Sequence, residues 1–146
     1  MAESSGSLAP GDSPGLLLWR TTLSWQRRIT AALKPLGLTH VQFVLLASTW
    51  WLTRVAGETP SQRRIAEHAG TDPMMTSQVI RALEAKELLR RDPDPSDSRA
   101  KLVDITPAGA RLAQRAVKVV EAADREFFGV APDQRALLEM LTALSR

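Results

Sequence analysis

Hydrophobic residues recur at helical spacing from the first apolar cluster of the chain. Across Leu16–Leu33 they stand three and four positions apart, which predicts an amphipathic helix. Ser13 and Pro14 are typical of a helix start, because serine caps free backbone N–H groups and proline fits the first helical position. Pro35 and Gly37 end the pattern.

A capping box opens the second predicted helix. Thr39 and Gln42 have the spacing at which a threonine and a glutamine side chain satisfy each other's free backbone N–H groups. This predicts a helix over about His40–Arg54. The residues expected to face the core are Val41, Val44, Leu45 and either Trp51 or Leu52.

Two short helices separated by a glycine come next. Ser61 opens the first, which Gly70 ends, and Asp72-Pro73 opens the second, which runs to about Lys86. Such a pair predicts a helix-turn-helix where small and apolar residues let the helices cross closely. Residues with that spacing are Ile65, Ala66, Ala69, Gly70, Thr76 and Val79.

Alternating residues then replace the helical pattern. Leu88–Arg91 and Lys101–Ile105 are predicted to be the strands of a β-hairpin, joined by a long turn-rich loop at 92–98. A long helix is predicted over about 107–128 and a last one from about residue 133. The order of four helices, two strands and two helices predicts a mainly α fold with a small β-hairpin.

Composition narrows the class of protein. The chain has 146 residues, 44% of them hydrophobic, which suits one domain with a buried core. Residues 1–13 are rich in Ser, Gly and Pro and are expected to form a disordered tail. No apolar run approaches the roughly 20 residues of a membrane helix, so no membrane partner is expected. The absence of cysteine excludes disulfides and thiolate metal sites and fits a cytoplasmic protein.

Charge alone does not identify a partner. The formal net charge is +3 and the pI about 9.9, which favours an acidic partner such as nucleic acid. Residues 58–106, however, contain 8 Lys and Arg against 9 Asp and Glu. The position of each charge therefore matters more than the total.

The exposed face of the second short helix carries candidate contacts to duplex DNA. The major groove accepts an α-helix, and within it glutamine pairs with adenine and arginine with guanine. The alternative is an ordinary helix corner with a solvated face. The candidate contacts are Pro73, Met74, Thr76, Ser77, Gln78 and Arg81.

The hairpin that follows favours the DNA-binding interpretation over a helix corner. Basic residues on a hairpin beside such a helix can reach a narrow minor groove, where the potential is most negative. Asp97 is two residues from Arg99 and is expected to hold its guanidinium in place. Taken alone, the hairpin would be a surface loop of mixed charges. The candidate contacts are Arg90, Arg91, Asp97, Arg99 and Lys101.

These residues resemble the MarR family of transcription regulators over about 15–145. The similar segments are Ser61–Gly70, Ser77–Glu84, Asp97-Ser98-Arg99 and Leu102–Gly109. The resemblance implies a winged helix-turn-helix in a homodimer whose first and last helices intertwine. It implies binding to a pseudo-palindromic operator on double-stranded DNA, usually to repress transcription. It also implies that Arg99 is the minor-groove residue of the wing tip and Asp97 its orienting partner.

The resemblance further implies a small aromatic or phenolic effector that enters a crevice between the dimer helices and the DNA-binding lobe. On this basis 14–37 and 107–146 form the dimerisation region, and 38–106 form the winged helix-turn-helix lobe. The alternative for the crevice is that its tryptophans are core residues and its histidine is a surface residue. The crevice candidates are Trp19, Trp25, His40, Trp50 and Trp51.

The chain departs from the family pattern in three ways. Glu87 stands where the family commonly has glycine, and a left-handed backbone there costs about 1 kcal/mol for other residues. The second short helix begins Pro73-Met74-Met75, with few polar groups for reading bases. The absence of cysteine excludes the oxidant-sensing branch of the family.

Other functions have weaker support in the sequence. An enzyme, a metal site and a cofactor are not expected, because the chain has no cysteine, no histidine cluster and no phosphate-cradling glycine loop. The alternative is a winged-helix module that binds a protein, which the near-neutral charge of 58–106 allows. The salt dependence of DNA binding distinguishes the two.

Overall fold

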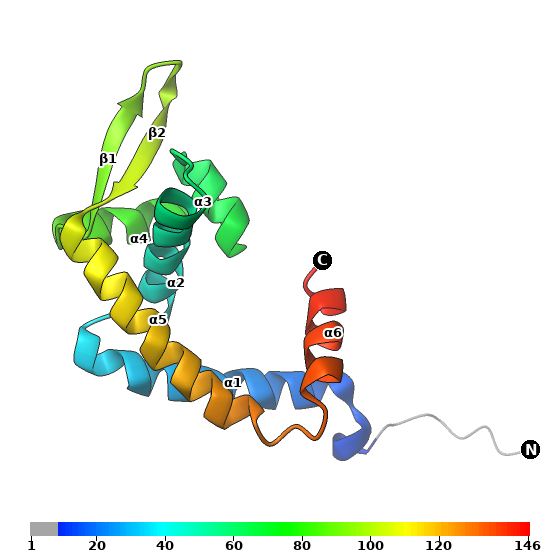
Figure 1. Ribbon diagram of the computed structural model, residues 1–146. Coiled ribbons are helices and arrows are strands. Elements are labelled where there is room, and N and C mark those ends of the chain that lie inside the picture. The colour runs from blue at the N-terminus through cyan, green and yellow to red at the C-terminus, as the bar shows by residue number, and fades with distance from the viewer. Residues whose placement is uncertain (1–8) are drawn as a thin grey trace, which may run out of the picture.

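Six α-helices and one two-stranded antiparallel sheet make up residues 9–146, the part of the chain that the computed structural model describes (Figure 1). The order of the elements confirms the predicted mainly α fold with a β-hairpin. The helices are α1 (Pro14–Leu33), α2 (His40–Trp50), α3 (Gln62–Ala69), α4 (Pro73–Ala85), α5 (Pro107–Phe128) and α6 (Gln134–Leu144), and the strands are β1 (Leu89–Asp94) and β2 (Asp97–Ile105).

Side-chain caps start the first two helices where the sequence predicts. The Ser13 hydroxyl accepts a hydrogen bond from the backbone N–H of Leu16 at 3.2 Å. The capping box of Thr39 and Gln42 has both of its reciprocal hydrogen bonds, at 3.1 and 3.2 Å. Each bond satisfies a backbone N–H that the first helical turn leaves free, so a local sequence pattern is enough to locate it.

The second helix ends differently from the prediction. α2 stops at Trp50, and the chain continues as a π-helical turn over Trp51–Val55. Leu52 enters the core with no exposed surface, whereas the side chain of Trp51 stays 43% exposed. Of the other expected core positions, Leu45 is buried, and Val41 and Val44 are half-buried.

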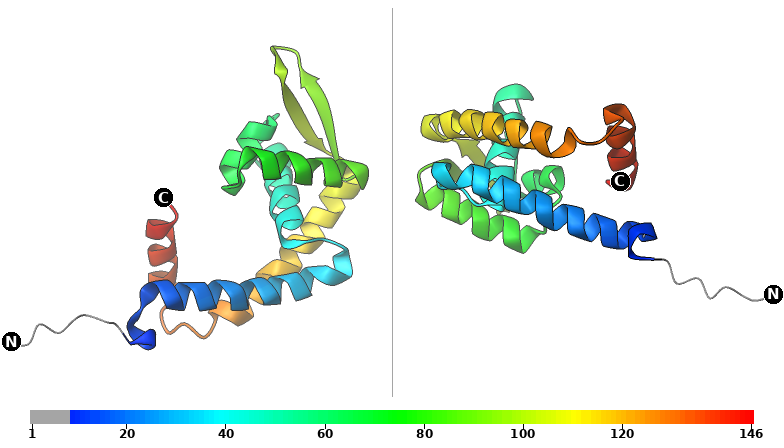
Figure 2. Two further views of the ribbon diagram at one scale, coloured as in Figure 1. Left: turned by 180° about the vertical axis from the view of Figure 1, so that it is seen from behind. Right: turned by 90° about the horizontal axis from the view of Figure 1, so that it is seen from below.

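The core lies where α1, α2 and α5 meet the helix-turn-helix formed by α3 and α4. Figure 2 shows α1 and α5 crossing below a lobe made of α2, α3, α4 and the hairpin. Leu45 and Leu46 of α2 have no exposed surface, and neither do Ile29 of α1 and Ala116 of α5. Ala113 and Val120 of α5 are buried on the same side as Ala116, so this part of α5 packs against its own chain.

The hairpin is longer, and its loop shorter, than the sequence predicts. β1 and β2 pair from Leu89 opposite Ile105 to Asp94 opposite Asp97, with a shift of register after Pro93. Proline and aspartate in this segment favoured a loop. In a two-stranded sheet every strand is an edge strand, however, and a proline there needs no hydrogen-bond partner for its nitrogen.

The last helix stands apart from the lobe. Figure 1 shows α6 at the end of the chain, turned away from the axis of α5, and none of its residues is buried. Leu138, Met140 and Leu144 of α6 are more than half exposed, and so are Leu18 and Trp19 of α1. A single chain therefore leaves two apolar helix surfaces uncovered.

Residues 1–8 of the expected disordered tail lie outside the described residues. Contrary to that expectation, Pro10–Asp12 form a 3-10 turn that leads into the cap of α1. No single helix within residues 9–146 is long and apolar enough to cross a membrane. α1 with its following turn and α2 meet that criterion only as a pair, bent by 72°.

Candidate nucleic-acid interface

α3 and α4 form a helix-turn-helix with a cap at each helix boundary. The Ser61 hydroxyl accepts from the backbone N–H of Arg64 at 3.0 Å and starts α3. Gly70 ends α3 with a φ of 73°, a left-handed conformation that glycine adopts without steric cost. The Asp72 carboxylate accepts from the backbone N–H of Met75 at 2.8 Å and starts α4. These caps set where α4 begins and hence which of its residues face outward.

Thr76 lies in the core of the helix-turn-helix and not at its surface. Its side chain has no exposed area, and its hydroxyl bonds to the carbonyl of Asp72 at 2.8 Å and to the hydroxyl of Thr71 at 2.6 Å. The prediction that Thr76 contacts DNA is therefore wrong. Ile80 and Leu83 are buried on the same side, which gives α4 a continuous core stripe.

The opposite stripe of α4 faces solvent. Met74, Gln78 and Arg81 are exposed, and their spacing of four and three residues puts them on one line along the helix. This line points away from the buried Thr76. Beside it lie Pro73, which is exposed, Ser77, which is half-buried, and Met75, which is exposed and was not predicted, although it stands three residues before Gln78.

The hairpin and the starts of α3 and α4 enclose a groove of about 690 Å³. Alternate residues of a strand share one face, and Asp97, Arg99 and Lys101 of β2 all line this groove. Arg63 of α3, which was not predicted, and Pro73 of α4 lie across from them. Wing residues and the first turn of α4 therefore share one concave surface.

Asp97 does not orient the Arg99 guanidinium in the way that the sequence suggests. Its carboxylate accepts from the backbone N–H of Arg99 at 3.0 Å. No ion pair within residues 9–146 involves the Arg99 side chain, which is exposed. Asp97 therefore shapes the backbone at the wing tip and leaves the guanidinium unpaired among the described residues.

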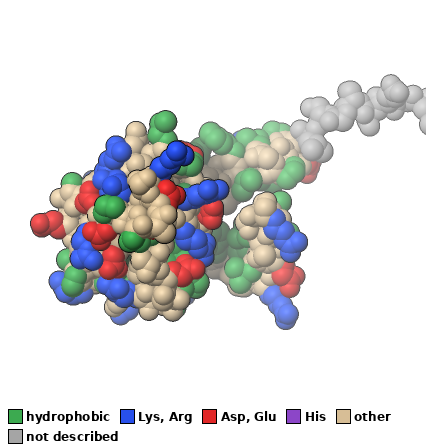
Figure 3. Space-filling view, turned by 90° about the horizontal axis from the view of Figure 1, so that it is seen from above, with side chains coloured by type: hydrophobic (Ala, Val, Ile, Leu, Met, Phe, Trp, Pro, Cys, Tyr) green, Lys and Arg blue, Asp and Glu red, His purple; other side chains and the backbone are tan. Residues whose placement is uncertain are grey.

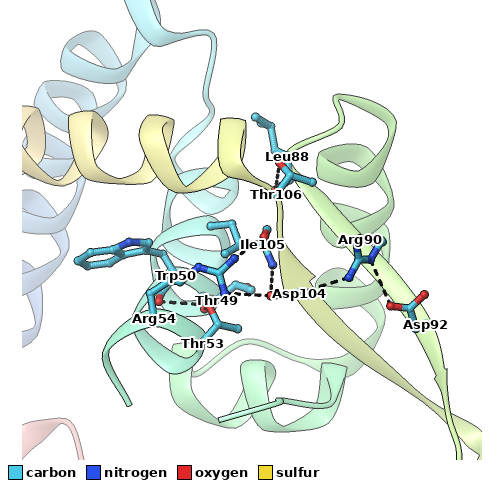
Figure 4. Close-up of polar contacts among 10 residues, drawn as sticks. All are labelled: Thr49, Trp50, Thr53, Arg54, Leu88, Arg90, Asp92, Asp104, Ile105 and Thr106. Atoms are coloured by element: carbon cyan, nitrogen blue, oxygen red, sulfur yellow. Dashed lines mark hydrogen bonds and ion pairs between the residues drawn. The ribbon is translucent and has the colours of Figure 1, made fainter. Parts of the chain in front are cut away.

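A network of ion pairs connects the base of the wing to the π-helical turn that follows α2. Figure 4 shows Arg90 between Asp92, at 3.3 Å, and Asp104, at 3.6 Å. Asp104 also pairs with Arg54 at 3.5 Å, and Arg54 donates to the carbonyl of Ile105 at 3.0 Å. Arg90 was predicted to contact DNA, but its guanidinium is shared by two carboxylates of the hairpin itself.

Arg91 holds the hairpin against α4. It donates to the two carboxylate oxygens of Glu84 at 3.0 and 3.3 Å and to the side chain of Gln62 at 3.2 Å. Its side chain is only 20% exposed, so Arg91, which is a predicted DNA contact, presents little of its guanidinium to a ligand. The Arg91 hydrogen bond favours the carboxylate form and lowers the pKa of Glu84 below its usual range.

The near-neutral total of residues 58–106 conceals an uneven distribution of charge. Figure 3 shows basic and acidic side chains intermixed over the face seen from the hairpin side. Within residues 9–146, however, no carboxylate pairs with Arg81, Arg99 or Lys101. Within residues 58–106, the acidic residues that do pair with arginines are Glu58, Glu67, Glu84, Asp92 and Asp104.

The junction between α4, the hairpin and α5 explains two features of the sequence. Glu87 adopts a φ of 60°, so the strained left-handed turn is present without a glycine. The Thr106 hydroxyl donates to the carbonyl of Glu87 at 2.7 Å and holds this turn against the start of α5. A Cβ on Gly109 would stand 2.0 Å from the carbonyl oxygen of Leu88, so only glycine fits at that close approach.

Within one chain, the five residues predicted to line a ligand crevice lie in several separate places. Trp25 and His40 are in contact, with ring centroids 5.0 Å apart, and Trp25 Nε1 donates to Asp124 at 2.8 Å. Burial lowers the pKa of His40. Trp51 lies about 16 Å further along the helix from His40, by its rise per residue, and stacks on His68. The remaining candidates are Trp19, exposed on α1, and Trp50, half-buried on α2.

Comparison with known sequences identifies relatives along nearly the whole chain. The MarR family signature matches residues 38–101, which contain α2, the helix-turn-helix and most of the hairpin. The chain is 41% identical to the uncharacterized HTH-type transcriptional regulator YdcH of Bacillus subtilis, over 92% of this chain and 91% of that protein. It is 36% identical to the HTH-type transcriptional repressor Rv2887 of Mycobacterium tuberculosis, over 91% of this chain and 94% of that protein.

Solved structures share the fold. CouR of Rhodococcus jostii RHA1, crystallised with p-coumaroyl-CoA, superposes with a TM-score of 0.77 at 26% identity, over 94% of this chain and 93% of that one. BpsR of Bordetella bronchiseptica, whose DNA binding is regulated by 6-hydroxynicotinic acid, gives a TM-score of 0.78 at 28% identity, over 90% of this chain and 98% of that one. The chain therefore belongs to the MarR family of winged helix-turn-helix transcription regulators.

Proposed function

We propose that this chain represses transcription as a homodimer that binds a pseudo-palindromic operator on double-stranded DNA. The observation that carries the proposal is the placement of Arg81, Arg99 and Lys101. These cations have no carboxylate partner among the described residues, and they lie on the exposed stripe of α4 and in the adjoining groove. Phosphate neutralisation by such cations supplies most of the affinity of proteins for DNA.

Each element of the interface has a defined task in this proposal. α4 enters the major groove, where Gln78 reads an adenine and Arg81 a guanine or a phosphate. The hairpin lies beside it and extends Arg99 into the adjacent minor groove. The residues proposed to contact DNA are Pro73, Met74, Ser77, Gln78, Arg81, Arg99 and Lys101.

Segments 14–37 and 107–146 form the dimerisation region in this proposal, and 38–106 form the DNA-binding lobe. The uncovered apolar residues of α6 and of the start of α1 support it, since a partner chain would remove them from water. A twofold axis through this region places the two copies of α4 about 34–36 Å apart, one turn of B-DNA. In this proposal the protein acts in the cytoplasm, where it would reach chromosomal DNA.

An aromatic effector completes the proposal. The CouR and BpsR structures concern p-coumaroyl-CoA and 6-hydroxynicotinic acid, both of which carry a hydroxylated aromatic ring. In this chain the pair of Trp25 and His40 lies between α1 and α2, beside Asp124 of α5, where ligand binding would bear on the angle between lobe and dimer helices. Release of bound DNA by p-coumaric acid, with cyclohexanecarboxylic acid as control, tests this part separately.

Selection of duplexes from a random pool, followed by fluorescence anisotropy, tests the main proposal. We expect the selected duplex to bind about 10³-fold more tightly than a scrambled duplex of the same composition. Equal and weak binding to both duplexes would contradict sequence-specific regulation. It would favour the alternative of a winged-helix module that binds a protein partner.

A further inference from the structure

The first turn of α4 presents an apolar tip at the place where a recognition helix meets the base edges. Pro73 and Met75 are exposed, and Met74 is 74% exposed. None of these side chains carries a strong hydrogen-bond donor or acceptor. In a helix-turn-helix the N-terminal residues of the second helix contact the bases. This tip therefore cannot read bases by hydrogen bonds.

An apolar surface of this kind can make a favourable contact with only one group on the base edges of the major groove, which is an apolar methyl group. Guanine, cytosine and adenine present donors and acceptors there, whereas thymine adds its C5-methyl group. An apolar side chain placed against any other base would leave that base's polar edge without a partner, at a cost in binding free energy. The chemistry of the tip therefore selects thymine.

We propose that Met74 determines specificity by packing on the thymine methyl group at one base pair in each half-site. Met74 is the first residue of the exposed line that continues through Gln78 and Arg81. Along one major groove, Met74 would therefore contact a methyl group, Gln78 would offer its amide and Arg81 its positive charge. Methionine suits this role because its unbranched thioether adapts to an irregular apolar surface. The inference rests on the proposed function, since it concerns how the same interface reads its operator.

Replacement of thymine by deoxyuridine isolates this contact. The substitution removes the methyl group and leaves every hydrogen-bonding group of the base pair in place. The probe is the duplex recovered by selection, with each thymine replaced in turn, and the readout is anisotropy. We expect one position per half-site at which the loss of the methyl weakens binding about three- to fivefold, the loss expected for one methyl group removed from apolar contact.

Two variants assign the effect to Met74. In Met74→Ala the thymine and deoxyuridine duplexes should bind equally, because the shorter alanine side chain no longer reaches the methyl group. In Met74→Leu, which keeps an apolar side chain of similar size, the preference for thymine should persist. Met74 is exposed and lies within a helix, so neither change is expected to disturb folding, and circular dichroism checks this.

The outcomes separate this inference from the proposed function. If the unaltered protein binds its selected duplex but tolerates deoxyuridine at every position, the methyl contact is wrong and specific DNA binding stands. If Met74→Ala keeps the preference for thymine, another residue reads the methyl and the assignment fails. If selection recovers no duplex at all, the proposed function fails, and this inference fails with it.

Discussion

Three arginines of the hairpin differ in whether a carboxylate of the protein already pairs with their guanidinium group. Arg90 is shared between two aspartates of the wing, and Arg91 is bound to Glu84 of α4, while Arg99 has no carboxylate partner among the described residues. The sequence predicts a DNA contact for all three. Folding distinguishes them because Glu84 and Asp104 reach the strand from other parts of the chain.

Arg99→Ala should therefore weaken binding to the selected duplex much more than Arg90→Ala. One arginine contact to DNA contributes about 1–3 kcal/mol, so we expect a loss of about ten- to a hundredfold for Arg99→Ala. Arg90→Ala is the matched control from the same hairpin and should change affinity only a few fold. Anisotropy measures both, and equal losses in the two variants would contradict the assignment of Arg99.

Protonation of Glu84 at acid pH should lower the free energy of unfolding of the lobe. Its pKa is lowered in the folded protein by the hydrogen bond from Arg91. Stability from this carboxylate is therefore complete above the unfolded pKa of about 4.3 and is lost as the pH falls through the lower folded pKa. The carboxylate is partly exposed, so the loss should stay below about 1 kcal/mol.

Urea unfolding at neutral pH and near pH 3 tests this with Glu84→Gln, which cannot titrate. The unaltered protein should lose more stability on acidification than the variant does. An identical loss in both proteins would show that the contact between Glu84 and Arg91 does not contribute to acid sensitivity.

Features that depend on residues close together in the sequence could be predicted, whereas features that depend on packing between distant segments could not. The caps at Ser13, Thr39 and Asp72 each involve residues three positions apart, and all are present as predicted. The length of the hairpin depends on pairing between β1 and β2, which the prolines do not prevent, so the predicted strands are too short. The burial of Thr76 depends on how α4 packs on α3, and no local pattern distinguishes a threonine at the surface from one in that interface.

The turn between α4 and β1 yields a prediction about stability. Glu87 is held in the left-handed region at a φ of 60°, and its side chain is exposed. Glu87→Gly should therefore stabilise the protein by about 0.5–1 kcal/mol, because relief of steric strain exceeds the entropic cost of glycine. Gly70→Ala, at a φ of 73° with open space around its Cβ, is the converse control and should destabilise the protein by a similar amount. The thermal unfolding temperatures of both variants test this prediction. A lower unfolding temperature for Glu87→Gly would show that the backbone at Glu87 is not strained.

As a whole molecule, the chain places its reading surface and its uncovered apolar helices at opposite ends. The groove and the exposed stripe of α4 belong to the upper lobe in Figure 1, whereas α1 and the end of the chain with α6 lie away from the hairpin. This separation allows a partner chain to cover the apolar helices while both reading surfaces stay open. Because one chain has one reading surface, only a dimer can bind two half-sites at once.

Loss of the dimer should therefore cost specificity. The double variant Leu141→Asp with Leu144→Asp puts charge into the apolar stripe of α6 and should give a monomer by light scattering. We expect the preference for the selected duplex over the scrambled one to fall at least tenfold, since one lobe reads only one half-site. Glu139→Gln, on the opposite face of α6, should leave the protein dimeric. A double variant that remains a dimer would contradict the proposed interface.

The salt dependence of DNA affinity tests the central claim most directly. A dimer contributes two copies each of Arg81, Arg99 and Lys101, and each phosphate that is neutralised contributes a slope of about −0.9 to log K against log salt concentration. Between about 50 and 200 mM KCl we therefore predict a slope near −5 on the selected duplex, and a much shallower one when all three residues are alanine. A slope near zero for the unaltered protein would contradict the account, because these cations would then not bind the phosphate backbone.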